Sequence, residues 1–150
     1  MAVLRDRPYA GFNFLVDLGD GNTEGPAAGF QTVGGLSQTV DVIEYRTGNS
    51  KENSVIKLPG LTRAGDVTLE RGVIGSLALF QWLDEIRSGS PQALRLVTIR
   101  LQNEDRSEVV MSWKLLRARI AGHSIGPLHA QASTLPIERL VLACERLELE

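Results

Sequence analysis

Most of the chain alternates apolar and polar residues with a period of two, which is the pattern of half-buried β-strands. The alternation is clearest in residues 11–18, 38–46 and 65–71, and shorter strands are predicted at 29–33 and 55–58. Within 38–46, Val40 and Val42 are predicted to share one face of the strand, and Ile43 lies on the other. Breaks rich in glycine, asparagine and aspartate separate these segments, as expected where a chain turns.

One segment departs from this period and predicts an α-helix. Apolar residues recur at helical spacing from Leu79 to Ile86, with Trp82 beside them, and polar residues face away. Ser76 is placed to accept the free amide hydrogens of the first turn as an N-cap. The segment Ser88-Gly89-Ser90-Pro91 ends the helix, because glycine and proline do not continue it.

Strand character returns in the last third of the chain. Strands are predicted at 94–101, 108–116 and 135–149, with a hairpin connection at 103–106 and an irregular stretch at 121–133. The middle of the last strand, around Leu140 and Leu142, is apolar on both faces, which is typical of a strand inside a sheet or at a subunit contact. About seven or eight strands, one helix and short connections predict a mainly β fold, an antiparallel β-barrel or sandwich with one packed α-helix.

Composition argues against nucleic-acid and membrane partners. At 150 residues the chain is most simply one domain spanning 1–150, and its net charge is only −2. Aromatic residues make up 5%, which is little for stacking on single-stranded nucleic acid. No apolar run approaches the roughly 20 residues of a membrane span, and no signal peptide precedes the first strand. We therefore expect synthesis in the cytoplasm and no membrane anchor.

The chain offers no pattern typical of a catalytic, cofactor or metal site. The paired glycines at 34–35 lack the spacing of a phosphate-binding loop. His123 and His129 have no metal-ligating residue close in sequence, and we interpret both as solvent-facing loop histidines. The single cysteine, Cys144, is interpreted as a small buried hydrophobe, and the scattered carboxylates, Glu138 among them, as structural. We predict no enzymatic activity and no cofactor.

Several short segments, taken in their order and spacing, resemble the inner tube proteins of contractile tails. The most specific are Lys57-Leu58-Pro59-Gly60-Leu61-Thr62 and Val67-Thr68-Leu69-Glu70-Arg71-Gly72-Val73. Weaker matches lie at 8–9, 12–16, 29–30, 33–36, 42–49, 126–128 and 137–143. The resemblance extends from about Pro8 to about Glu148, and the sequence departs from the family between Leu116 and Ser124.

The resemblance implies a subunit that forms hexameric rings, which stack into a hollow tube. A sheath protein is expected around the tube, baseplate or hub proteins at its start, and a tape-measure protein or cargo in its lumen. Contraction of the sheath would drive the tube through a target envelope, and the assembled tube would form part of a virion or a released particle. A phage tail, a bacteriocin-like particle and an extracellular toxin injector remain alternatives, as do the main tube subunit and a paralogue at the baseplate end.

Residues 47–63 are predicted to form an arm that projects toward a neighbouring subunit. The prediction combines a polar tip with a rigid apolar base that turns at Pro59-Gly60. The predicted subunit-interface residues are Glu44, Tyr45, Arg46, Asn49, Lys51, Lys57, Leu58, Pro59, Gly60, Leu61 and Arg63. An ordinary long hairpin loop is the alternative.

Two other functions stay open on the sequence. A monomeric small β-barrel that binds a ligand would need an apolar cavity and would not polymerise. An enzyme would need His123 or His129 in a reactive arrangement with other groups.

Overall fold

A computed structural model describes residues 2–150 and contains, in that range, nine strands, one α-helix and two short 3-10 helices. The strands are β1 Phe14–Asp17, β2 Thr32–Gly34, β3 Gln38–Tyr45, β4 Ile56–Ala64, β5 Val67–Gly72, β6 Arg95–Gln102, β7 Val109–Ile125, β8 Ile137–Ala143 and β9 Arg146–Leu149. The helices are η1 Pro26–Ala28, α1 Ala78–Arg87 and η2 Pro91–Ala93.

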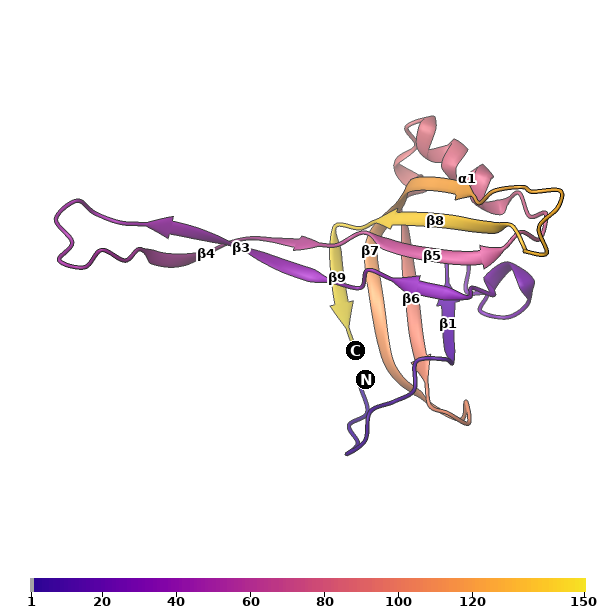
Figure 1. Cartoon of the computed structure of the whole chain (residues 1–150), viewed down its shortest axis with the longest axis horizontal. Coiled ribbons are helices and arrows are strands. Elements are labelled where there is room, and N and C mark those ends of the chain that lie inside the picture. Colours follow the sequence, from indigo (N-terminus) through magenta and orange to yellow (C-terminus); the bar gives the residue numbers. More distant parts are fainter. Residues whose placement is uncertain (1) are drawn as a thin grey trace.

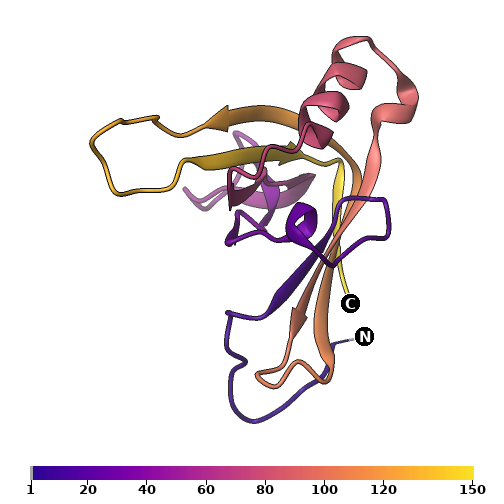
Figure 2. The ribbon, with the colours of Figure 1, turned by 90° about the vertical axis from the view of Figure 1, so that its right-hand side faces the viewer.

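Seven of the strands form one antiparallel sheet in the order β1-β6-β7-β8-β5-β2, with β9 paired to β7. The sheet folds over on itself because β7 is long enough to belong to two layers (Figure 2). Its first half pairs with β6 and β9, and its second half pairs with β8. Arg117 lies between the halves with a φ of 52°, a left-handed conformation that bends a strand. The predicted mainly β, antiparallel fold with one helix is confirmed.

The core lies between the two layers and is formed by the side chains of each strand that face inward. Val67 and Leu69 on β5 face inward with Leu140 and Leu142 on β8, and all four side chains are fully buried. The other buried apolar residues of the core are Val16, Leu79, Trp82, Val97, Ile99, Leu115, Ala118, Ile120 and Leu147. Period-two alternation in these strands therefore sorts side chains between the core and the outer surface.

Helix α1 packs on the end of the sheet much as its periodicity predicts. Leu79 and Trp82 are buried, and the other apolar positions of that face are half-buried against the core. The N-cap is Leu77 and not the predicted Ser76, but the Ser76 hydroxyl still accepts a hydrogen bond from the Ala78 amide at 3.2 Å, which satisfies one free first-turn donor. Gly89, with a φ of 78°, ends the helix and donates to the Ile86 carbonyl.

Three predicted strand boundaries are wrong for the same physical reason. Residues 121–125, predicted to be irregular, continue β7, because their backbone pairs with β8 despite the glycine at 122. The predicted strand 135–149 is two strands, since the chain crosses the bend between the layers at Cys144 and Glu145. The second strand lies at 32–34 rather than 29–33. Pairing partners far away in the sequence set these boundaries.

β3 and β4 form a separate two-stranded sheet that projects from the body of the molecule (Figure 1). Pro59 and Gly60 lie inside β4, so the predicted turn at this position is wrong. The register of the pair shifts between Val40 and Val42, and Pro59 is opposite Val42. Proline is tolerated there because each strand of a two-stranded sheet has a free edge. A Cβ on Gly60 would lie 2.8 Å from the Asp41 carbonyl oxygen, so glycine permits the close approach.

Replacing Trp82 with phenylalanine tests how α1 is held against η2, the 3-10 helix that follows it. The buried indole Nε1 donates to the Ala93 carbonyl at 2.6 Å, and phenylalanine leaves this buried acceptor without its donor. We expect the free energy of unfolding in urea to fall by about 1–3 kcal/mol. Trp113→Phe, at a half-buried position on β7, is the control, and its loss of unfolding free energy should be smaller. Equal losses in the two variants would contradict the assigned role of the Trp82 hydrogen bond.

Candidate functional site

The projecting hairpin, Gln38–Ala64, is the arm, and one face of its outer half is apolar. Directly opposite residues of an antiparallel pair share a face, and Ile43 is opposite Leu58 while Tyr45 is opposite Ile56. These four side chains form the arm apolar face, and they are between 46% and 60% exposed. A contiguous apolar patch on a soluble protein marks an interaction surface more often than a chance arrangement.

The opposite face of the arm is mixed, with the exposed Val40 and Val42 beside charged residues, and the tip is polar. Glu44 and Lys57 are opposite each other on the face away from Ile43 and Leu58. At the tip, Arg46 donates from Nε to the Glu52 carbonyl at 3.1 Å and from Nη2 to the Ser50 carbonyl at 3.3 Å. Arg46 therefore shapes the tip turn, and in the outer half of the arm the charged Glu44 and Lys57 lie away from the arm apolar face.

The residues predicted at a subunit interface, from Glu44 to Arg63, all lie on the arm. The structure thus brings them together on one element, although the predicted range, 47–63, begins too late. Arg63 pairs with Asp41 of the same arm, with Nη2 and Oδ2 3.0 Å apart. The sequence reasoning missed Ile43 and Ile56 as members of the exposed apolar face. Their alternation in β3 and β4 is visible in the sequence, but it is also the pattern of strands that cover a core.

A narrow neck joins the arm to the body. Gly35 has a φ of 82°, and a Cβ there would overlap the Asp66 carbonyl oxygen of the returning strand. The Gly65 amide donates to the Ser37 carbonyl at 2.8 Å, and a Cβ on Gly65 would overlap the Ser37 hydroxyl. At Gly35 the two backbones can lie this close only because the residue is glycine, whereas at Gly65 the overlap is with a serine side chain. The neck therefore packs the two strands of the arm tightly where they leave the body.

Gly35→Ala tests the neck. Alanine at a positive φ is strained, and its methyl group would also displace the backbone at Asp66. We expect the free energy of unfolding to fall by about 1–3 kcal/mol, measured by chemical denaturation. Gly48→Ala at the arm tip is the matched control, since nothing lies within 4 Å of its added Cβ. A Gly35→Ala variant as stable as the Gly48→Ala variant would show that the neck tolerates a side chain.

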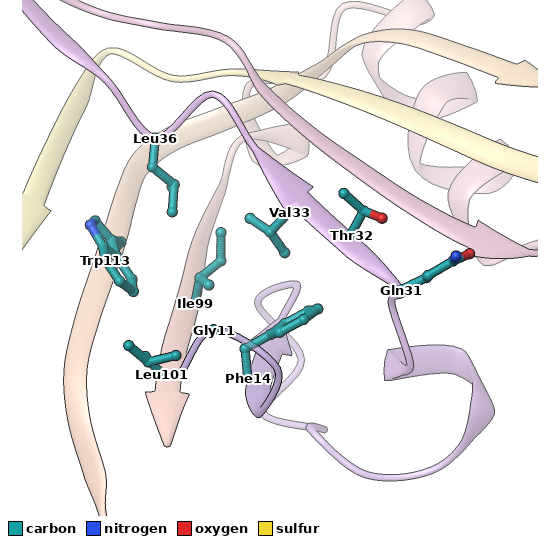
Figure 3. A pocket seen from close by; sticks show the side chains of 9 residues that line it. All are labelled: Gly11, Phe14, Gln31, Thr32, Val33, Leu36, Ile99, Leu101 and Trp113. Carbon is teal, nitrogen blue, oxygen red and sulfur yellow. The ribbon is translucent and has the colours of Figure 1, made fainter. Parts of the chain in front are cut away.

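An apolar groove of about 330 Å³ opens between β1 and β2, the two strands at the ends of the sheet order (Figure 3). Phe14 from β1 and Val33 from β2 form its sides, and Trp113 of β7 lies at one end. The full lining is Gly11, Phe14, Gln31, Thr32, Val33, Leu36, Ile99, Leu101 and Trp113. None of these side chains is ionisable, so the groove suits an apolar guest and offers no group for acid–base chemistry.

A buried ionic cluster beneath the 19–31 loop links three strands. Arg71 on β5 and Glu138 on β8 are opposite residues, with Nε and Oε2 3.0 Å apart. The other carboxylate oxygen of Glu138 lies 2.7 Å from Nε2 of His123 on β7. Arg71 also donates from Nη1 to the Ala27 carbonyl at 2.6 Å, and its guanidinium lies 5.3 Å from the centre of the Phe30 ring. The cluster thereby ties the loop that carries η1 to the sheet.

This cluster corrects one interpretation of the sequence. His123 is not a solvent-facing loop residue, because β7 continues through it and brings it to Glu138. The Glu138 carboxylate is buried, and both of its oxygens are bonded within the cluster. The alternation of β5 could have predicted that Arg71 is buried. Val67, Leu69 and Arg71 are two residues apart and all face inward. Arg71 and His123 each bond to Glu138, which is typical of a structural ion network.

The remaining candidate residues show no reactive arrangement. His129 lies in an exposed loop, as predicted, and its Nδ1 accepts a hydrogen bond from the Gln131 amide at 3.1 Å. Burial raises the pKa of the half-buried Cys144 thiol, which disfavours the nucleophilic thiolate. Among residues 2–150, no group of histidine, cysteine and acidic side chains could hold a metal ion. Within the same residues, no helix has the length and apolar character needed to span a membrane.

Glu138→Gln tests the ionic cluster. Burial raises the pKa of Glu138, but hydrogen bonds from His123 and Arg71 outweigh this effect and lower the pKa below its ordinary value of 4.5. The charged carboxylate therefore stabilises the fold above about pH 4.5, and this contribution is lost as the pH falls through the lower folded-state value. At neutral pH the variant leaves Arg71 buried without its counter-charge, and we expect a loss of about 3–5 kcal/mol in unfolding free energy.

The control for this variant lies on the same two strands. Glu70 on β5 pairs with the exposed Arg139 on β8, at 2.9 Å between Oε1 and Nη2. Glu70→Gln should cost less than about 1 kcal/mol, because that ion pair is at the surface. The difference in unfolding free energy between wild type and Glu138→Gln should become smaller at acid pH. A difference that does not change with pH would contradict the assigned charge effect.

Comparison with known proteins identifies relatives of the whole chain. Residues 10–148 match the family described as T4-like virus tail tube protein gp19. The fold is similar to a chain in the cryo-EM structure of the PVC sheath-tube complex in the extended state, an extracellular contractile injection system. That alignment has 27% sequence identity and a TM-score of 0.82, and it covers 97% of this chain and 93% of the other.

Two further cryo-EM structures, both of the anti-feeding prophage, contain similar chains. A chain of the tube terminating cap has 26% identity and a TM-score of 0.82, with 100% of this chain and 95% of the other covered. A chain of the baseplate has 27% identity and a TM-score of 0.79, with 97% of each chain covered. No curated protein sequence matches the chain.

Proposed function

This chain belongs to the family of T4-like virus tail tube proteins, and we propose that its copies form hexameric rings that stack into the inner tube of a contractile injection system or phage tail. The observation that carries the proposal is the similarity of nearly the whole fold to a chain of a sheath-tube complex. Family members and these neighbours are structural tube proteins, and we infer that this chain likewise works without catalysis or a cofactor.

The partners follow from the assemblies in which the similar chains occur. Those structures are a sheath-tube complex, a tube terminating cap and a baseplate. We infer a sheath around the tube, whose contraction drives the tube through a target envelope, and a baseplate or hub on which the tube starts. A tape-measure protein or cargo would occupy the lumen. Assembly would occur in the cytoplasm, before the tube becomes part of a virion or a released particle.

The arm is the element of this subunit best suited to join copies. It projects beyond the body (Figure 1), and the four side chains of its apolar face are about half exposed. Burial of apolar surface contributes about 25 cal/mol per Å², whereas exposed ion pairs contribute little. We therefore propose that Tyr45, Leu58 and the other predicted interface residues contact an adjacent subunit, with apolar burial as the main source of affinity.

The two alternative functions have weaker support. The comparisons give none to a monomeric ligand-binding barrel. The apolar groove is compatible with such a module, but a ligand carrier has no use for a long arm with an exposed apolar face. An enzyme that uses His123 is disfavoured by geometry, because His123 is hydrogen-bonded to Glu138 within the structural cluster.

Deletion of residues 50–54 tests the arm as an assembly element. These tip residues are exposed or partly exposed and lie far from the core, so the melting temperature followed by circular dichroism should barely change. Negative-stain images of the wild type at high concentration, or with its baseplate partner, should show rings or tubes, and the deletion should reduce them strongly. A variant with 50–54 replaced by glycine and serine at the same length separates tip sequence from tip length. If the deletion variant formed tubes in normal abundance, the tip would not be part of the contact between subunits.

A further inference from the structure

We propose that the groove between β1 and β2 receives the arm apolar face of a neighbouring copy. The proposal rests on the proposed function, since it names the contact through which tube subunits join. Each copy then carries one donor, the arm, and one acceptor, the groove. Three independent features of the structure support this pairing: the chemistry of the two surfaces, the free strand edges beside them and the direction of the arm.

The two surfaces match in chemistry. The groove offers Phe14, Val33 and Trp113 and has no charged side chain in its lining. A charged guest would lose its hydration there without gaining a counter-charge, at a high cost. In the outer half of the arm, the arm apolar face presents Ile43, Tyr45, Ile56 and Leu58, while Glu44 and Lys57 lie on the other face. The Asp41–Arg63 ion pair lies nearer the body, so the outer half of the arm can enter the groove without carrying a charge into it.

Both surfaces also carry backbone groups without sheet partners. β1 pairs only with β6, and β2 pairs only with β5, so each leaves a free edge at the groove. β3 and β4 pair only with each other, so the arm has a free edge on both sides. Free edges of this kind favour pairing with another strand. An extended, two-stranded guest such as the arm is thus better suited to this groove than a helix or a small molecule.

The arm that fills the groove must come from another copy. Figure 1 shows the arm directed away from the body, so the arm does not cover the groove of its own chain. Because donor and acceptor are different surfaces, each contact leaves a free arm at one end and a free groove at the other. Such head-to-tail association produces closed rings or extended stacks, and both occur in a tube.

Disulfide trapping tests the contact directly. In a Cys144→Ala background, Thr32→Cys at the exposed groove rim is combined in turn with Ile43→Cys, Ile56→Cys or Leu58→Cys on the arm apolar face. Assembled samples are oxidised with glutathione disulfide and separated on non-reducing gels. We expect a ladder of disulfide-linked oligomers from at least one of these pairs. The matched controls combine Thr32→Cys with Glu44→Cys or Lys57→Cys on the opposite face and should remain monomeric on the gel.

A single substitution provides a second measurement. Thr32→Lys places a charge at the groove rim and should raise the concentration needed for assembly by about tenfold or more. Gln92→Lys, at an exposed position outside the groove, should leave it unchanged. Tubes that form normally from Thr32→Lys, or tubes in which no arm-face cysteine pair forms a ladder, would overturn the groove contact and leave the proposed function intact. Wild-type protein that forms neither rings nor tubes, even with a baseplate partner, would overturn both.

Discussion

Apolar surface that the chain does not bury within itself is the constraint on which the rest of this structure depends. The body satisfies its own needs, with Val67, Leu69, Leu140 and Leu142 fully buried between the two layers of the sheet. The arm, by contrast, exposes Ile43, Leu58 and their neighbours, and the sheet ends in two strands that do not pair with each other. Folding and assembly are therefore separate steps in the burial of apolar surface, and a tube subunit needs this division.

Two features connect the core to the exposed surfaces. At the neck, the backbones of the two strands of the arm come so close that a side chain at Gly35 would overlap the Asp66 carbonyl oxygen. The ionic cluster holds the loop before β2, because Arg71 donates to the Ala27 carbonyl and the Gln31 amide donates to the Glu70 carbonyl at 2.7 Å. That loop leads directly into the rim of the groove. The buried ionic cluster thus helps to position the loop that leads into the uncharged groove.

Local patterns in the sequence predicted some elements well and others poorly. The helix followed from its periodicity, its Ser76 hydroxyl and its terminal Gly89, all of which act within a few residues. Residues 121–125 were missed because their strand conformation comes from pairing with β8 rather than from local preference. Pro59-Gly60 suggested a turn because both residues have low strand preference locally. In the structure both lie within β4, where a free sheet edge accommodates them.

The order of apolar and polar residues was enough to establish a mainly β chain with one helix, and the motifs around Lys57–Thr62 and Val67–Val73 indicated a tube protein, which the family match confirms. These properties are local, since they depend on neighbours along the chain. The bend in β7, the contact of His123 with Glu138, and the groove between β1 and β2 arise only when distant strands pair. Alternation shows that a strand has an apolar face, but whether that face meets the core, as in β5, or solvent, as in the arm, depends on where the fold places the strand.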